Sequence, residues 1–186
     1  MESSTESDTV LTSSNRPRIL LFPGDGNGKT TAALGMVLRA VGNGLRCYVV
    51  HFLKSDASVG EYNALQSLGV VIEIGGLGFV PHADTPRFTQ HTQAAQNALH
   101  MAQKFLDQTD CDLLVLDEVC GAISLGLISV DMVTELLARA KNSQIVVLTG
   151  RDAPQTLIDQ ADTVTEMRKI KHGYDQKILA QRGVEW

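Results

Sequence analysis

The sequence is short of basic residues, cysteine, aromatic side chains and long apolar runs. Its formal net charge of −5 at pH 7 argues against a general nucleic-acid-binding protein, whose surface would be basic. No apolar run approaches the ~20 residues that a membrane-spanning helix needs. Cys47, Cys111 and Cys120 form no C-x-x-C pair, so we expect ordinary buried thiols rather than a zinc or redox site.

The first residues lack both the basic region and the apolar region of a secretory signal peptide. Residues 1–16, MESSTESDTVLTSSNR, are instead rich in serine and threonine and carry early acidic residues. We therefore expect a cytoplasmic protein whose residues 1–16 form a disordered tail. The remainder, 17–186, has the ordinary size of a single domain.

A glycine-rich turn lies within the segment RILLFPGDGNGKTTAALG at 18–35. The apolar run before it predicts a buried strand at 19–22, and the residues after it favour a helix. The glycines free the backbone to direct N–H groups at a phosphate, Lys29 can reach a terminal phosphate, and Thr30 can place its hydroxyl on Mg²⁺. The positive end of the helix dipole faces the same anion. These features predict a phosphate-binding P-loop.

The spacing departs from the pattern G-x-x-x-x-G-K-[ST], because Pro23 stands where the first glycine belongs. The alternative is a glycine-rich turn that binds nothing. The strand before the turn and the helix after it favour the P-loop, since they supply the context that the motif requires.

Apolar runs and amphipathic stretches alternate along the rest of the chain. We expect further strands at 47–52, 70–74, 112–116, 144–148 and 163–166, and helices at 32–41, 61–68, 86–106, 129–140 and 154–160. The loop at 75–86, GGLGFVPHADTP, is too rich in glycine and proline to be regular. The alternation predicts an α/β fold with a mostly parallel sheet and helices on both faces. Ligands of such folds bind at the carboxyl ends of the strands.

A second acidic motif, LLVLDE at 113–118, ends a predicted strand. Asp117 or Glu118 would hold Mg²⁺ directly or through water, and in a hydrolase one of them could orient an attacking water. The alternative is a helix N-cap with a solvated neighbour.

The histidines do not form a metal site by spacing, and His91 and His100 lie about half a turn out of phase on one helix. Lys171, His172 and Arg182 could reach an anion or form a solvated basic tail.

Seven segments and the pair Gly60-Glu61 are similar in sequence and in order to segments of one protein family. The segments are GDGNGKTTAALG (24–35), LRAVGNGLR (38–46), VVHFLK (49–54), LLVLDE (113–118), VVLTGRDAP (146–154), ADTVTEMRKIKH (161–172) and AQRGVE (180–185), and Gly60-Glu61 lies between VVHFLK and LLVLDE. Together they resemble the P-loop type of ATP:corrinoid adenosyltransferases, also called cob(I)alamin adenosyltransferases.

The resemblance implies a RecA-like P-loop NTPase fold, usually homodimeric, that transfers the 5′-deoxyadenosyl group of ATP to Co(I) of a reduced corrinoid. Triphosphate would be released, in adenosylcobalamin synthesis or salvage, with a flavoprotein as a possible electron donor. Lys29 and Mg²⁺ (or Mn²⁺) would neutralise the triphosphate, and Thr30, Asp117 and Glu118 would hold the metal, which makes Lys29 and Glu118 the catalytic candidates. The residues implied in ATP binding are Gly24, Asp25, Gly26, Asn27, Gly28, Lys29, Thr30 and Thr31.

The chain departs from the family pattern at several positions. Asn27 replaces a common lysine, His51 a common glutamine and Ser55 a common glycine. In some relatives an aromatic pair after the third strand holds the corrinoid with its lower axial ligand removed. Phe79 matches the first member of that pair, whereas Pro81 stands at about the position of the second. We expect Phe79 to bind the corrinoid; the alternative is a ring that only packs in the core.

Two other classes of function remain open from the sequence. An ordinary P-loop NTPase or small-molecule kinase would use Glu118 to activate water or a hydroxyl, and would release phosphate or ADP. A corrinoid-binding relative would keep the fold but turn over weakly.

Overall fold

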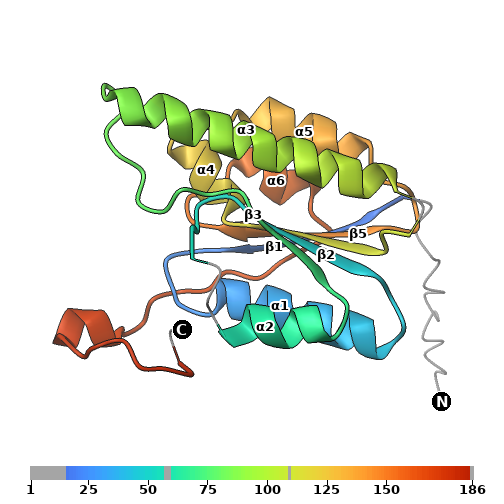
Figure 1. Ribbon diagram of the computed structural model, residues 1–186, viewed down its shortest axis with the longest axis horizontal. Helices are drawn as coiled ribbons and strands as arrows, with labels where there is room; N and C mark the ends of the chain where they lie inside the picture. Colours follow the sequence, from blue (N-terminus) through green and yellow to red (C-terminus); the bar gives the residue numbers. More distant parts are fainter. Residues whose placement is uncertain (1–15, 57–59, 109, 185–186) are drawn as a thin grey trace, which may run out of the picture.

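A central sheet of parallel strands organises the part of the chain that the computed structural model describes, residues 16–56, 60–108 and 110–184 (Figure 1). The strand order is β3-β2-β4-β5-β1-β6, and every neighbouring pair is parallel. Residues of β2 and β4 are buried throughout, which explains why both strands are continuous apolar runs. The strands are β1 (Arg18–Pro23), β2 (Cys47–His51), β3 (Val71–Ile74), β4 (Leu113–Asp117), β5 (Ile145–Gly150) and β6 (Thr163–Val164).

Helices cover both faces of the sheet, so the sheet lies between two helical layers (Figure 1). One layer holds α1 and α2, and the other holds α3, α4, α5 and α6 (Figure 1). The helices are α1 (Lys29–Gly42), α2 (Gly60–Ser67), α3 (Pro86–Asp107), α4 (Val119–Ser124), α5 (Val130–Ala138) and α6 (Gln155–Gln160), and a 3₁₀ turn, η1, follows at Gly173–Gln176.

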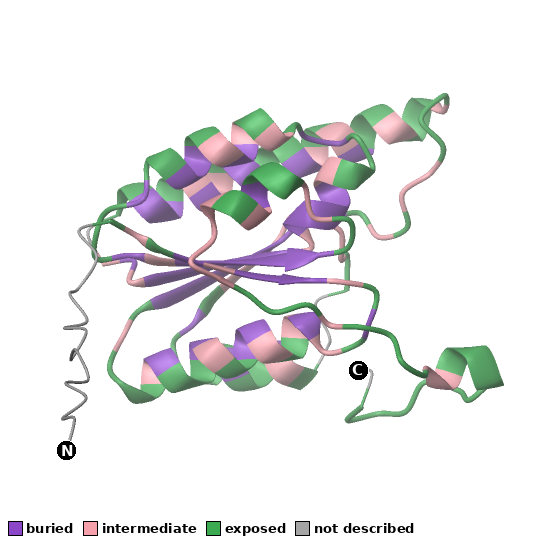
Figure 2. Ribbon diagram, turned by 180° about the vertical axis from the view of Figure 1, so that it is seen from behind, coloured by how far each residue is buried: buried purple, intermediate pink, exposed green. Residues whose placement is uncertain are grey.

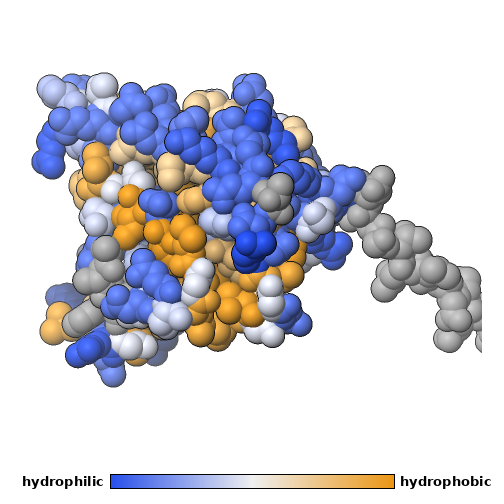
Figure 3. Space-filling model, turned by 45° about the vertical axis from the view of Figure 1, so that its right-hand side comes forward, coloured by the Kyte–Doolittle hydropathy of each residue, from blue (hydrophilic) through white to orange (hydrophobic). Residues whose placement is uncertain are grey.

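Two apolar clusters form the core, one on each face of the sheet (Figure 2). Leu99, Leu106 and Leu136 belong to the cluster under α3 and α5, while Leu34 and Val37 belong to the cluster under α1. The three cysteines are free and buried, as expected. Apolar side chains also gather on one outer face between hydrophilic zones (Figure 3). None of the described helices combines the length and apolar character that a membrane crossing would require.

The predicted strands and helices are present, with ends that differ by a few residues, and the sheet is fully parallel rather than mostly parallel. The sequence did not predict α4, because six residues are too few to show helical periodicity. Residues 1–15 of the predicted tail lie outside the described residues. Arg16, the last residue of the predicted tail, is described, and its guanidinium pairs with the Asp162 carboxylate.

Candidate functional site

The P-loop connects β1 to α1 and is packed against the segment that follows β6. Met167 N donates to Pro23 O at 2.7 Å, and Gly26 N donates to Met167 O at 2.6 Å. A Cβ at Gly24 would lie 2.4 Å from Met167 O, and one at Gly26 would lie 2.6 Å from it. Glycine is therefore required at both positions by the close approach of another backbone strand.

Lys29 begins α1 and points back into the loop. The residue is 6% exposed, and its ammonium donates to Gly26 O at 2.8 Å. Burial lowers the pKa of Lys29, while the nearby Glu118 carboxylate acts in the opposite direction. The P-loop therefore holds a cation at its centre, where a phosphate oxygen can replace the carbonyl as its partner.

Asp117 ends β4 and lies fully buried beneath the P-loop. Its Oδ1 accepts from the hydroxyls of Thr30 and Thr149, both at 2.8 Å, and its Oδ2 lies 2.8 Å from His51 Nδ1. Lys54 Nζ is 3.8 Å from the same Oδ2. Burial alone would raise the pKa of Asp117, but the hydrogen bond from His51 and the charges nearby lower it. Asp117 is therefore an ionised acceptor that joins four parts of the chain.

Glu118 adopts a left-handed backbone conformation, with φ of 59°. Such a conformation costs a non-glycine residue about 1–2 kcal/mol. The Glu118 N–H donates to Thr149 Oγ1 at 2.9 Å, which holds the backbone there. Although Glu118 occupies the N-cap position of α4, its side chain makes no capping hydrogen bond and instead lines the pocket described next. Burial, followed by the Asp117 charge, raises the pKa of Glu118.

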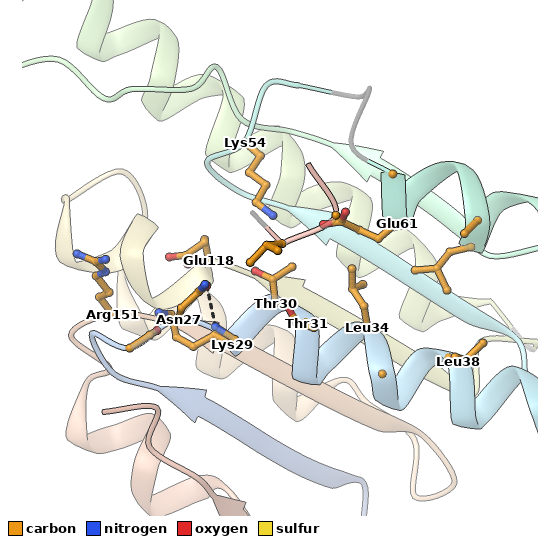
Figure 4. Close-up of a pocket in the computed structure, with 18 of the residues that line it drawn as sticks. Asn27, Lys29, Thr30, Thr31, Leu34, Leu38, Lys54, Glu61, Glu118 and Arg151 are labelled. Atoms are coloured by element: carbon orange, nitrogen blue, oxygen red, sulfur yellow. Dashed lines mark hydrogen bonds between the residues drawn. The ribbon is translucent and has the colours of Figure 1, made fainter. Parts of the chain in front are cut away.

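A pocket of about 760 Å³ opens from the P-loop between α1 and α2. Figure 4 shows Lys29, Lys54, Glu118 and Arg151 gathered around its polar end, while leucines on α1 extend away from it. The apolar wall includes Leu34, Leu38, Ala64, Leu65 and Leu68. The pocket therefore offers cations for a polyphosphate at one end and apolar contact for a flat or apolar group at the other.

Sequence comparison identifies the family. The model described as ATP:corrinoid adenosyltransferase BtuR/CobO/CobP matches residues 15–186. The chain belongs to this family.

Curated relatives agree with the family assignment. Corrinoid adenosyltransferase of Escherichia coli K12 and corrinoid adenosyltransferase CobA of Salmonella typhimurium are each 34% identical over 90% of this chain and 85% of their own length. Corrinoid adenosyltransferase of Pseudomonas aeruginosa is 37% identical over 90% of this chain and 83% of its own length. The chain is a corrinoid adenosyltransferase with ATP and a corrinoid as substrates, which confirms the predicted enzyme class.

The fold has a counterpart among solved structures. Flagellar accessory protein FlaH from Methanocaldococcus jannaschii superposes with a TM-score of 0.52, over 81% of this chain and 72% of that chain, at 11% identity. This likeness shows the fold alone. With the parallel sheet, it confirms the predicted α/β fold class.

This pocket contains most of the predicted site residues. Those lining it are Asp25, Gly26, Asn27, Gly28, Lys29, Thr30, Thr31 and Glu118. Gly24 lies behind the loop against Met167, and Asp117 lies beneath Thr30, so neither lines the pocket. His172 lines the pocket, whereas Lys171 and Arg182 do not.

Phe79 lies outside this pocket, in the loop after β3. Its side chain is 95% exposed, so the alternative that it only fills the core is wrong. The loop leading to it is held in place: Gly78 N donates to Leu53 O at 2.8 Å, and a Cβ at Gly76 would lie 2.1 Å from Leu53 C. Val80, the next residue, packs against the core. The fold therefore presents an apolar ring to solvent on a fixed backbone, at the carboxyl edge of the sheet.

Sequence reasoning missed Lys54, Arg151 and Glu61, which also line the pocket. The signal was present: Lys54 follows β2, and Arg151 directly follows β5. The carboxyl ends of parallel strands meet at one edge, so charged residues immediately after them are candidates for ligand contact. Nothing in the sequence indicated that His51 contacts Asp117 directly.

The polar end of the pocket suits a hard divalent cation such as Mg²⁺. Thr30 Oγ1 donates its proton to Asp117, which leaves lone pairs free, and Glu118 adds a partly buried carboxylate. Among the described residues, no group of three His, Cys, Asp or Glu side chains could hold a metal alone. The Thr30 hydroxyl and the Glu118 carboxylate are oxygen donors, which fit Mg²⁺ because this ion prefers oxygen ligands and completes its shell with water and phosphate oxygens.

Proposed function

We propose that the enzyme transfers the 5′-deoxyadenosyl group of ATP to Co(I) of a reduced corrinoid and releases triphosphate, with residues 17–186 as the working unit. The observation that carries this proposal is the pocket itself, which combines a P-loop and several cations with an apolar wall. Co(I) attacks C5′, the cobalt–carbon bond forms, and the electrons of the breaking C5′–O bond leave on triphosphate. The nucleophile is the substrate's cobalt, so no protein nucleophile is needed.

The protein's own groups act on the leaving group. Backbone N–H groups of the P-loop and the Lys29 ammonium bind the triphosphate, and Arg151 and Lys54 supply further positive charge at the same end of the pocket. Thr30 and Glu118 would hold Mg²⁺, with Asp117 acting through Thr30; the ion, when bound, neutralises charge on the triphosphate. Orientation of C5′ toward cobalt then supplies the rest of the rate enhancement.

Product identity tests the reaction. We expect anaerobic incubation with ATP, Mg²⁺ and chemically reduced cobalamin to give adenosylcobalamin and triphosphate in equal amounts. Release of ADP or orthophosphate without a cobalt–carbon bond would instead indicate an ordinary NTPase. The same assay at a series of Mg²⁺ concentrations tests the metal requirement.

Arg151→Ala is expected to weaken productive ATP binding. The guanidinium lies at the polar end of the pocket near Lys29 and Glu118 and is exposed, so the fold does not depend on it. Losing a hydrogen bond to a charged group costs about 1.5–3 kcal/mol, which should appear in kcat/KM for ATP. Arg151→Lys should recover only part of the lost kcat/KM, since lysine keeps the charge but lacks the planar guanidinium that can donate two parallel hydrogen bonds to a phosphate. Arg139→Ala, which breaks an exposed pair with Asp107, is the matched control; an equal loss there would contradict a specific role.

Phe79→Ala is expected to impair the corrinoid step. An apolar ring packed beneath the macrocycle would exclude water and block return of the lower ligand, which makes Co(II) easier to reduce. The variant should therefore lose adenosylation of enzyme-bound Co(II) corrinoid under a mild reductant but keep activity with pre-reduced Co(I). Because the ring is exposed, the melting temperature should not fall.

Val71→Ala, at an exposed apolar residue that starts β3, is the control for Phe79→Ala. Equal losses with Co(II) and Co(I) substrates would contradict a role for Phe79 in the reduction of the bound corrinoid.

We further propose a cytoplasmic homodimer that accepts electrons from a flavoprotein, as the family resemblance implies. Sedimentation equilibrium tests the dimer, and a monomer at micromolar concentration with full activity would overturn it.

A further inference from the structure

His51 joins the P-loop site from the end of β2. In the parallel pairing of β2 with β4, His51 lies opposite Asp117, so the two side chains are neighbours. The imidazole is fully buried, and Nδ1 lies 2.8 Å from Asp117 Oδ2. One face of the ring packs on Tyr62, with ring centroids 4.6 Å apart. The ring is therefore fixed by both packing and hydrogen bonding.

The direction of the His51 hydrogen bond follows from its partner. An ionised carboxylate only accepts, so Nδ1 must carry the proton and donate it to Asp117. Tyr62 Oη lies farther from the same nitrogen, at 3.2 Å. Nε2 has no hydrogen-bond partner among the described atoms. Asp117 is therefore the nearer of the two groups within hydrogen-bond distance of Nδ1.

The two carboxylate oxygens of Asp117 contact different hydrogen-bond partners. Oδ2 receives His51, and Oδ1 receives the hydroxyls of Thr30 and Thr149. If the carboxylate rotated, Thr30 would lose the acceptor that directs its proton away from the pocket. The Thr149 hydroxyl, in turn, accepts from the Glu118 N–H. Both proposed metal-holding residues therefore depend on the orientation of one buried carboxylate.

We propose that His51 is a positioning residue for adenosyl transfer: its Nδ1–H holds Asp117 so that Oδ1 takes the Thr30 proton and leaves the Thr30 lone pairs free for Mg²⁺. This inference rests on the proposed metal role of Thr30. Removing the donor lets the carboxylate turn, which weakens the metal site without touching the P-loop backbone or Lys29. Partners that orient metal-binding groups in this way typically change metal affinity by about 10–100-fold when lost.

The test compares three variants by calorimetric titration of ATP at a series of Mg²⁺ concentrations and without Mg²⁺. His51→Leu removes the donor, whereas His51→Asn places an amide N–H near the position of Nδ1. We expect His51→Leu to raise the Mg²⁺ midpoint at least about 10-fold while metal-free ATP binding is unchanged. His51→Asn should recover most of that loss. Tyr62→Phe, which keeps the ring and removes the hydroxyl, should have the wild-type midpoint.

Each other outcome has a definite meaning. A wild-type Mg²⁺ midpoint in His51→Leu, or equal loss in His51→Leu and His51→Asn, would overturn the positioning role. An equal loss of ATP binding with and without Mg²⁺ would also overturn it, because it would indicate general damage. If His51→Leu does not fold, His51→Ala replaces it in the comparison with His51→Asn. A wild-type enzyme that binds ATP independently of Mg²⁺ would instead remove the proposed metal role itself.

Discussion

Lys29→Ala is expected to weaken binding of Mg·ATP by about 2–5 kcal/mol, because truncating one partner of a buried ion contact leaves the phosphate charge unpaired. The native ammonium is held at the centre of the P-loop by Gly26 O rather than by the apolar core. The fold should therefore survive, and the melting temperature without nucleotide should not fall. Burial lowers the pKa of Lys29, which means that the charged ammonium is less favourable in the folded protein than in water. Removing it therefore also removes this desolvation free energy from the folded state.

Calorimetric titration with ATP measures the loss directly. Lys104→Ala, at an exposed lysine in the last turn of α3, is the matched control because it removes the same charge far from the pocket. Binding of ATP by Lys29→Ala within a few-fold of the wild-type affinity would contradict the P-loop role.

Glu118→Gln and Asp117→Asn are expected to impair turnover with opposite effects on stability. Glu118→Gln replaces a carboxylate by an amide, a poorer ligand for a hard cation, whereas Asp117→Asn weakens the acceptor that orients the Thr30 hydroxyl, so the Mg²⁺ requirement of both variants should rise at least about 10-fold. Burial and the Asp117 charge raise the pKa of Glu118, so its charged form is unfavourable in the folded protein. Neutral glutamine removes that cost, and Glu118→Gln should be no less stable than the wild type at pH 7.

Asp117→Asn should lose stability as well as activity. Each oxygen of Asp117 accepts from donors, and an amide would turn its own N–H toward either the hydroxyls of Thr30 and Thr149 or the ring of His51. A buried donor without an acceptor costs about 1–3 kcal/mol. Thermal melts and a Mg²⁺ titration of adenosylation measure the two effects separately. Wild-type rates for both variants at all Mg²⁺ concentrations would mean that the LLVLDE segment is only structural.

The opposed stability effects also separate two explanations of lost activity. A general weakening of the site would lower the melting temperature of both variants. If the loss is confined to metal binding, only Asp117→Asn should have a lower melting temperature, because only that variant removes a buried hydrogen-bond acceptor.

The sequence by itself determined the parts of this enzyme that depend on local chemistry. Continuous apolar runs predicted the buried parallel strands, and the glycines with Lys29 and Thr30 predicted the phosphate-binding turn. The opposite faces of His91 and His100 also followed from helical periodicity, since the first is buried and the second is exposed. These features depend on residues that are close together in the chain, so a local stretch of sequence is enough to predict them.

Only the tertiary structure decided how distant segments share one site. Gly24 and Gly26 are required because the backbone at Met167 lies against them, more than a hundred residues later in the chain. His51 contacts Asp117 because β2 pairs with β4 in one register, and Lys54 and Arg151 meet the P-loop because three strands end at the same edge. Strand pairing is a long-range choice made by packing of the whole core, which no local pattern encodes. For the same reason the sequence could not decide whether Phe79 packs in the core or binds a ligand, whereas in the structure its side chain is exposed.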